Sequence, residues 1–228
     1  MEGLKATEYN QAYYEEHRAA GLDYLGHGYW QQSYARMIAQ ATLQAEEPEA
    51  VFFDAGCACG SILQGFKSTG IFHLVYGMDR SEYMVEIGRE HFGFVRFEIV
   101  AGDIACTAFE EETVSLIHCA QVLEHVPADH MGRVVGEFAR ILQPGGRAFI
   151  CLDAIKHGET AEKYSSDPTH VNLQPTAYWT RLFEQAGLLF DREAYDRFVR
   201  SALGPTRGDP RTWFQSYPDW SVWTLIKP

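Results

Sequence analysis

Residues 51–60 read Val-Phe-Phe-Asp-Ala-Gly-Cys-Ala-Cys-Gly, a short apolar run that ends in an acid and passes into a turn with spaced glycines. The run predicts a buried β-strand, and the amphipathic segment 61–68 predicts the helix that follows it. Gly56 and Gly60 have no Cβ atom, so the backbone of the turn can take unusual dihedral angles and approach a ligand closely. A turn of this kind also occurs without a ligand, so its meaning depends on the rest of the chain.

Short apolar runs alternate with amphipathic stretches from this point to about residue 153. Further strands are expected at 73–78, 95–100, 114–120 and 148–152, and two last strands at 188–199 and 220–226. Further helices are expected at 81–91, 129–142 and 178–186. Buried strands that alternate with helices are typical of a parallel sheet covered on both faces. We therefore predict an α/β fold with a doubly wound, Rossmann-like, seven-stranded and mostly parallel sheet.

The chain is expected to form one domain, because 228 residues are enough to bury a single sizeable core. Two helical stretches rich in tyrosine and glutamine between residues 8 and 43 predict an N-terminal helical cap. The domain then divides into the cap at 1–48, a ligand-binding core at 49–154, and substrate-side insertions with the last strands at 155–228.

The formal net charge of −12 argues against a surface that neutralises phosphates, so no nucleic-acid or membrane partner is expected. Five cysteines, without a basic and apolar leader, do not resemble a secreted disulfide framework. No apolar run approaches the roughly 20 residues that span a bilayer. We expect a cytoplasmic protein.

Three acids stand at the ends of the first three expected strands: Asp54, Asp79 and Asp103. The carboxyl ends of parallel strands share one edge of a sheet, where ligands of this fold bind. A carboxylate at Asp79 can accept both hydroxyls of a ribose. Asp103 with Ile104 offers an acceptor for an adenine amino group and an aliphatic wall for its ring. The three acids together indicate a site for an adenosyl group.

These residues resemble the class I S-adenosylmethionine-dependent methyltransferases, in particular small-molecule enzymes of the type 11 kind. The resemblance covers roughly residues 50–154 and is carried by the stretches 54–60, 76–79, 101–104, 120–126 and 140–146. One position departs from the family pattern, because the middle glycine of the first motif is Ala58 here. The extra methyl group narrows the turn.

The resemblance implies S-adenosylmethionine as the cofactor and a role for each matching residue. Asp54, Gly56 and Gln121 would lie near the methionine moiety, Asp79 on the ribose, Met84 near the adenine, and Asp103 with Ile104 at the adenine edge. The expected cofactor-binding set is completed by Cys57, Ala58, Gly60, Arg80, Tyr14 and Trp30. A nicotinamide-dependent dehydrogenase is the nearest rival, but its G-x-G-x-x-G fingerprint is absent, since Cys57, Ala58 and Cys59 separate Gly56 from Gly60.

Two histidines are candidates for a general base, which methyl transfer needs only if the acceptor is protonated. His170 lies in the segment Asp-Pro-Thr-His-Val-Asn at 167–172, and similar segments of small-molecule methyltransferases carry an acceptor-facing histidine. His125 follows the fourth strand, where similar quinone-biosynthesis O-methyltransferases have a metal-binding Glu-x-x-Glu-His. The first acid of that motif is Gln121 here, a weaker ligand, so no metal is expected. Both histidines also have a structural alternative, in which they stiffen loops by hydrogen bonds.

The aromatic flanks have two interpretations, core packing and a lid over the site. We expect Tyr13, Tyr14 and Trp30 to help cover the cofactor. The pair Cys57 and Cys59 lacks a second pair at ligand spacing, so it fills space beside the cofactor.

The expected activity is methyl transfer to an oxygen or nitrogen of a small-molecule acceptor, such as a sugar or a natural-product-like metabolite. The alternatives are a peptide or lipid-linked acceptor, and a cofactor-binding module without turnover. A monomer or homodimer is expected.

Overall fold

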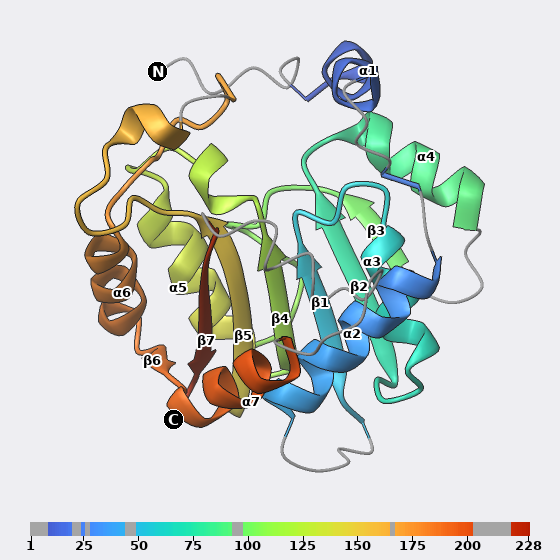
Figure 1. Cartoon of the computed structure of the whole chain (residues 1–228). Helices are drawn as coiled ribbons and strands as arrows, with labels where there is room; N and C mark the ends of the chain where they lie inside the picture. The colour runs from blue at the N-terminus through green and yellow to red at the C-terminus, as the bar shows by residue number, and fades with distance from the viewer. Residues whose placement is uncertain are drawn as a thin grey trace.

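The computed structural model describes residues 9–19, 24–25, 28–43, 49–92, 98–164, 167–202 and 220–228. Its centre is a seven-stranded sheet with the order β3-β2-β1-β4-β5-β7-β6 (Figure 1). The strands are β1 (Val51–Ala55), β2 (Leu74–Asp79), β3 (Glu98–Ala101), β4 (Val114–Ala120), β5 (Leu142–Asp153), β6 (Leu189–Phe190) and β7 (Trp220–Ile226). Neighbouring strands from β3 to β5 are parallel, whereas β7 runs antiparallel to β5 and β6. The predicted doubly wound, mostly parallel sheet is confirmed.

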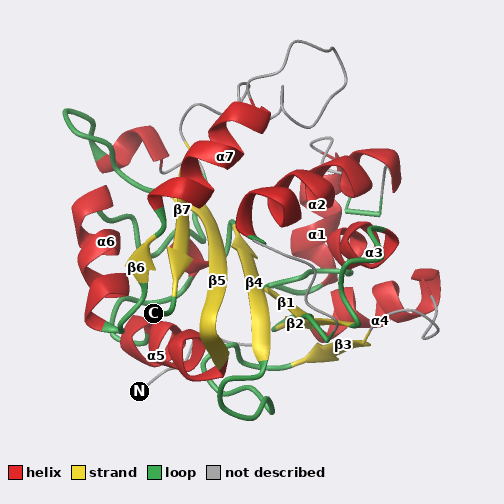
Figure 2. Ribbon diagram, turned by 90° about the horizontal axis from the view of Figure 1, so that it is seen from below, coloured by secondary structure: helices red, strands yellow, loops and turns green. Residues whose placement is uncertain are grey.

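Helices cover both faces of this sheet (Figure 2). They are α1 (Gln11–Ala19), α2 (Gly28–Thr42), α3 (Ser61–Ser68), α4 (Glu82–Phe92), α5 (Met131–Ile141), α6 (Thr176–Gln185) and α7 (Arg192–Ala202), with short 3-10 helices η1 (Leu123–His125) and η2 (Ala161–Tyr164). Within the described residues, none of the helices combines the length and apolar character needed to cross a bilayer.

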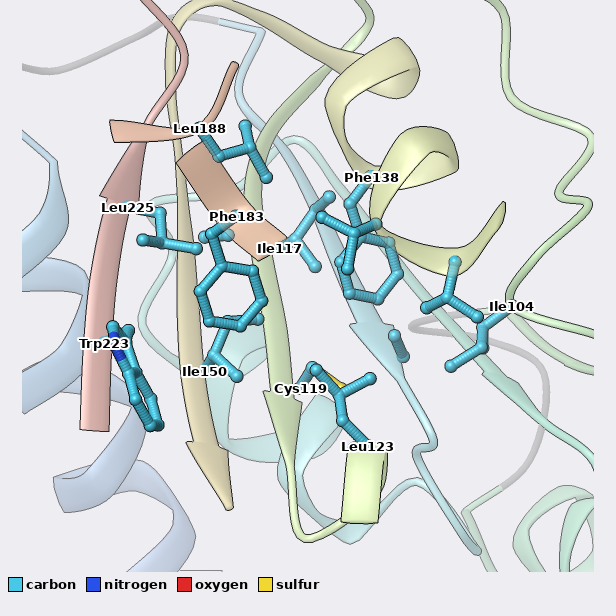
Figure 3. Packing of buried hydrophobic residues seen from close by; sticks show 14 of the residues in the cluster. Ile104, Ile117, Cys119, Leu123, Phe138, Ile150, Phe183, Leu188, Trp223 and Leu225 are labelled. Carbon is cyan, nitrogen blue, oxygen red and sulfur yellow. The ribbon is translucent and has the colours of Figure 1, made fainter. Parts of the chain in front are cut away.

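Two apolar cores lie on opposite faces of the sheet, because successive side chains of a strand point to opposite sides. On one face, Phe138 of α5 and Phe183 of α6 pack against Ile117 and Ile150 (Figure 3). The other core is formed by residues of α2, α3, α7 and the sheet, among them Ile38, Phe66, Phe198, Phe52 and Phe149. Burial of the central strands on both faces fixes the sheet on which the site is built.

The two N-terminal helices have different positions. Helix α2 covers a face of the sheet, where Tyr34 and Ile38 are fully buried. Helix α1 lies instead at the end of the sheet where β1 and β2 finish (Figure 1). Only α1 therefore has the position expected of a cap over a ligand site.

The predicted strand at 188–199 is wrong. Only Leu189 and Phe190 form a strand, and helix α7 begins at Arg192. Asp191 starts this helix, because its carboxylate accepts a hydrogen bond from Ala194 N at 2.9 Å. Ala194 and Phe198 then repeat at helical spacing and are buried. The expected strand at 148–152 is also longer than predicted, since β5 already begins at Leu142.

The strand order reverses between β1 and β4, which lie side by side at the centre of the sheet. In open α/β sheets, ligands bind beyond the carboxyl ends of the strands at such a reversal. Here that place is the turn after Ala55 and the loop after Ala120.

Candidate functional site

The turn after β1 is a tight backbone cradle. Three of its residues have positive φ angles: 81° at Gly56, 46° at Ala58 and 80° at Gly60. The amides of Gly56 and Cys57 both donate to the carbonyl oxygen of Met78, at 2.8 and 3.1 Å, which ties the turn to the end of β2. The predicted strand–turn–helix unit is therefore present, with Ala58 itself in the left-handed region.

Ala58 is strained in this turn, because a side chain with a Cβ atom is disfavoured at positive φ. We expect Ala58→Gly to raise the free energy of unfolding by roughly 0.5–1 kcal/mol, after allowing for the greater freedom of glycine in the unfolded chain. Thermal unfolding of both proteins measures this difference. A midpoint that stays the same or falls would contradict the assigned backbone conformation.

Asp79 lies at the end of β2 and holds the turn through its carboxylate. Oδ2 accepts a hydrogen bond from Ala58 N at 2.7 Å, and Oδ1 accepts one from Ser81 N at 2.8 Å. The side chain is buried, and this burial raises the pKa of Asp79. The two hydrogen bonds act to lower the pKa, whereas the nearby Asp54 carboxylate acts to raise it further. Each oxygen keeps a lone pair beyond the one that accepts these bonds, so the group remains able to accept ligand hydroxyls.

The loop after β4 lies against the turn after β1. A Cβ atom on Gly56 would come within 2.2 Å of Cγ2 of Val122, so only glycine fits at this approach. Gln121, next to Val122, has a φ of 56°, and its amide donates to the Cys151 carbonyl oxygen at 2.7 Å. Its side-chain Nε2 is buried and has no oxygen or nitrogen partner among the residues that the structure describes, although the side chain lies near the Cys151 thiol and acts to lower the pKa of that group. A buried donor without an oxygen or nitrogen partner beside a backbone cradle fits a polar ligand group at this place.

The remaining expected cofactor residues have varied surroundings. Ile104 is 8% exposed and packs with Met78, while Asp103 is exposed and its Oδ1 accepts from Ala105 N at 2.9 Å. Met84 is buried against Tyr14 and Cys59. Arg80 is exposed. The turn, Asp79 and Met84 therefore lie close together, whereas Asp103 and Arg80 are exposed at the surface.

The N-terminal tyrosines cover the turn. Tyr14 of α1 is 9% exposed and packs against Cys59 and Met84. Its burial, and to a smaller extent the nearby charge of Asp79, raises the pKa of its hydroxyl far above the ordinary range. Ser81 Oγ donates to the Tyr9 carbonyl oxygen at 2.6 Å, which fixes the chain just before α1. Trp30 lies on α2, but its side chain falls outside the described part of the structure. A lid role for Tyr14 stays a prediction.

Both candidate histidines lie together beyond the ends of β4 and β5. The rings of His125 and His170 meet edge to face, with centroids 4.7 Å apart. His125 Nδ1 lies 2.9 Å from Thr169 Oγ1, and His170 Nδ1 lies 3.8 Å from Asp153 Oδ2.

Helix α1 and the residues just before it reach this histidine pair as well as the turn. The ring of Tyr9 lies edge to face with that of His125, at 6.0 Å. The hydroxyl of Tyr13 donates to Asp167 Oδ2 at 3.4 Å. The same short segment therefore spans the turn after β1 and the histidine pair.

Glu124 is a site residue that the sequence did not single out. Its side chain is fully buried; Oε1 accepts from Asp153 N at 3.1 Å, and Oε2 has no hydrogen-bond partner in the described ranges. Burial raises the pKa of Glu124 to about 8, and the charge of Asp153 adds to the shift. The carboxyl group is therefore mostly protonated at neutral pH. The Glu-x-x-Glu-His comparison includes Glu124 as its second acid, but no local pattern indicates the raised pKa, because the shift comes from burial by distant segments.

Glu124, His125 and His170 bring ligand atoms within 4.8 Å of one another, a spacing that would suit a metal ion. Metal binding requires the deprotonated carboxylate, so a cation at this place would have to displace the proton that burial of Glu124 favours. That the site works without a metal stays a prediction, which rests on the neutral Gln121 in place of the first acid of the motif.

We expect EDTA to leave turnover unchanged and elemental analysis to find no stoichiometric metal; loss of activity that Mg²⁺ or Zn²⁺ restores would contradict this.

Comparison with known proteins gives matches of sequence and of fold. Residues 53–150 match the family model described as a methyltransferase domain. None of the curated proteins is a match. The family match over residues 53–150 confirms the predicted resemblance, and solved structures confirm the predicted fold.

Three of these structures illustrate the likeness. One is a TehB-like SAM-dependent methyltransferase from Corynebacterium glutamicum, 21% identical over 98% of each chain, with a TM-score of 0.59. Another is geranyl diphosphate C-methyltransferase from Streptomyces coelicolor, in complex with Mg²⁺, geranyl diphosphate and S-adenosyl-L-homocysteine; it is 17% identical over 87% of this chain and 79% of that one, with a TM-score of 0.63. The third is a complex between a methyltransferase activator and a putative methyltransferase from Haloferax volcanii, matched at 18% identity over 87% and 90% of the two chains, with a TM-score of 0.62.

Proposed function

We propose that this chain, whose residues 53–150 match the model of a methyltransferase domain, transfers a methyl group from S-adenosylmethionine to an oxygen or nitrogen of a small polar acceptor. One observation carries the proposal. The backbone turn with Asp79 and the histidine pair lie at the same edge of the sheet, on the two sides of the β1–β4 reversal.

The residues of the turn fit this cofactor. Asp54 and Asp79 place two buried carboxylates beside a backbone cradle, and the cofactor carries a sulfonium and an ammonium group. The buried Nε2 of Gln121 would donate a hydrogen bond to the carboxylate group of S-adenosylmethionine. Asp79 would accept the ribose hydroxyls, while Met84 and Ile104 would contact the adenine.

The histidine pair supports a polar acceptor with a dissociable proton. S-adenosylmethionine supplies a methyl group that is open to in-line attack. The acceptor oxygen or nitrogen would form the new bond to the methyl carbon while the carbon–sulfur bond breaks and its electron pair stays on sulfur. His170 would take the acceptor proton, with Asp153 and Asp167 stabilising the resulting positive charge. Tyr9 and Tyr13 would exclude water from this side.

The surroundings of this pair favour a hydroxylated acceptor over an apolar one. Asn172 is 1% exposed, and neither of its side-chain polar atoms has a hydrogen-bond partner in the part of the chain that the structure describes. Its backbone amide donates to the Glu124 carbonyl oxygen at 2.9 Å, which places the residue next to the histidine pair. Unpartnered polar groups of this kind are suited to hydrogen bonds with a sugar or a similar metabolite.

The test measures release of S-adenosylhomocysteine from the purified protein with S-adenosylmethionine and fractions of a polar metabolite extract. We expect release that depends on a fraction, and transfer of labelled methyl to an oxygen or nitrogen of one compound. Tight cofactor binding without release in any fraction would instead indicate a binding module. Labelled methyl on carbon, the reaction named for the Streptomyces coelicolor protein, would contradict the assigned acceptor atom.

A further inference from the structure

A chain of three buried side chains connects the end of β1 with helix α2. Asp54 Oδ1 lies 2.6 Å from His118 Nδ1, and His118 Nε2 lies 2.8 Å from the hydroxyl of Tyr34. The exposed fractions are 2% for Asp54, 3% for His118 and 1% for Tyr34. None of these contacts belongs to the histidine pair at His125 and His170.

The imidazole of His118 is held in one orientation. Asp54 and His118 are direct neighbours in the parallel register of β1 and β4, so both side chains leave the sheet on the same face. The ring is stacked on Phe149 of β5, with centroids 5.9 Å apart and planes 9° from parallel. The ring of Tyr34 meets it edge on at 5.6 Å. Rotation of the imidazole is therefore blocked by packing on several sides.

These contacts select the proton position on His118. Burial raises the pKa of Tyr34 well above its ordinary value, so its hydroxyl keeps a proton and can donate to Nε2. An imidazole that accepts at Nε2 carries its proton on Nδ1, where it donates to Asp54. Tyr34 thus acts on Asp54 through the tautomer of His118.

Asp54 needs this support because a buried carboxylate is costly without a hydrogen-bonding partner. The residue directly precedes the turn at 55–60, and its charge contributes to the raised pKa values of Asp79 and Cys57, after the effect of burial. The field of the Asp54 carboxylate therefore reaches the place where the proposed function puts the cationic part of the cofactor.

We propose that His118 and Tyr34 are positioning residues, which hold the Asp54 carboxylate in the orientation that binds S-adenosylmethionine. The inference rests on the proposed function and assigns a part of its binding site to strand β4 and helix α2. It makes cofactor affinity depend on two residues that themselves lie in the core.

Calorimetric titration with S-adenosylmethionine tests the inference on the full chain. We expect His118→Phe to weaken binding about tenfold or more, and Tyr34→Phe about fivefold, as for loss of a buried hydrogen bond to a charged or coupled group. His118→Asn retains an N–H donor near the position of Nδ1 and is expected to weaken binding no more than Tyr34→Phe. Rescue by asparagine distinguishes positioning of Asp54 from simple filling of space.

Thr42→Val is the matched control on the same helix. Its hydroxyl is buried and donates to the Ile38 carbonyl oxygen at 2.8 Å, away from Asp54. We expect this variant to bind like the wild type even where its thermal midpoint is lowered as much as that of Tyr34→Phe. If His118→Phe does not fold, Tyr34→Phe and His118→Asn carry the test.

Two outcomes are distinguishable. Wild-type affinity in the His118 and Tyr34 variants, or an equal loss in Thr42→Val, would overturn this inference and leave the proposed function intact. Absence of binding to the wild-type protein would overturn the proposed function, and this inference with it.

Discussion

Asp79→Ala should weaken binding of S-adenosylmethionine by roughly 10- to 100-fold, equivalent to about 1.4–3 kcal/mol. The carboxylate of Asp79 both supports the turn, through Ala58 N and Ser81 N, and offers its remaining lone pairs to the ribose hydroxyls. Alanine removes both contributions. Calorimetry of the variant and the wild type measures the loss directly.

Asp191→Ala is the control, because it removes a hydrogen-bonded carboxylate at a place away from the proposed cofactor site. Asp191 also accepts a backbone hydrogen bond, from Ala194 N, and pairs with Arg147 at 2.7 Å, but it lies at the start of α7. We expect Asp191→Ala to lower the thermal midpoint and leave cofactor affinity unchanged. If Asp79→Ala binds as well as the wild type, the ribose assignment is wrong.

His170→Ala should lower turnover by about 10²- to 10⁴-fold while cofactor affinity stays near that of the wild type, as expected for loss of a general base. The His170 ring lies beside His125 and faces Asp153, away from the turn that is proposed to hold the cofactor. The loss should therefore appear in kcat and spare the affinity for S-adenosylmethionine. Single-turnover measurements with an acceptor that the wild-type protein methylates separate the chemical step from binding.

His157→Ala is the matched control for this prediction, since His157 also follows β5 but is exposed. We expect it to retain full turnover. A His170→Ala variant that keeps its turnover and loses stability would make His170 a structural residue of the loop, which is the alternative that the sequence left open.

Most of the fold was predictable because its signals are local. The apolar runs at 51–53 and 114–120, the turn at 54–60 and the acids after two strands each identify an element through neighbouring residues. The wrong strand at 188–199 also had a local signal, since Asp191 can cap a helix and Arg192 pairs with Asp196 one turn later. The apolar run at 188–190, just before Asp191, is typical of a strand and conceals this helix start.

The site was predictable only in part, because some of its contacts join segments far apart in the chain. The histidine pair needs the loops after β4 and β5 to meet, and the sequence named both histidines without placing them together. His118 was missed because a single histidine within an apolar strand is ambiguous until β1 and β4 are known to be neighbours. The raised pKa of Glu124 depends on complete burial, which no local pattern gives.

If the turn after β1 and the acid after β2 bind an adenosyl cofactor, titration of the wild-type protein with S-adenosylhomocysteine shows this binding without any acceptor. We expect a single site with an affinity in the micromolar range, typical of enzyme ligands, and no comparable heat with NAD. Absence of binding to S-adenosylhomocysteine, or tighter binding of NAD, would contradict it.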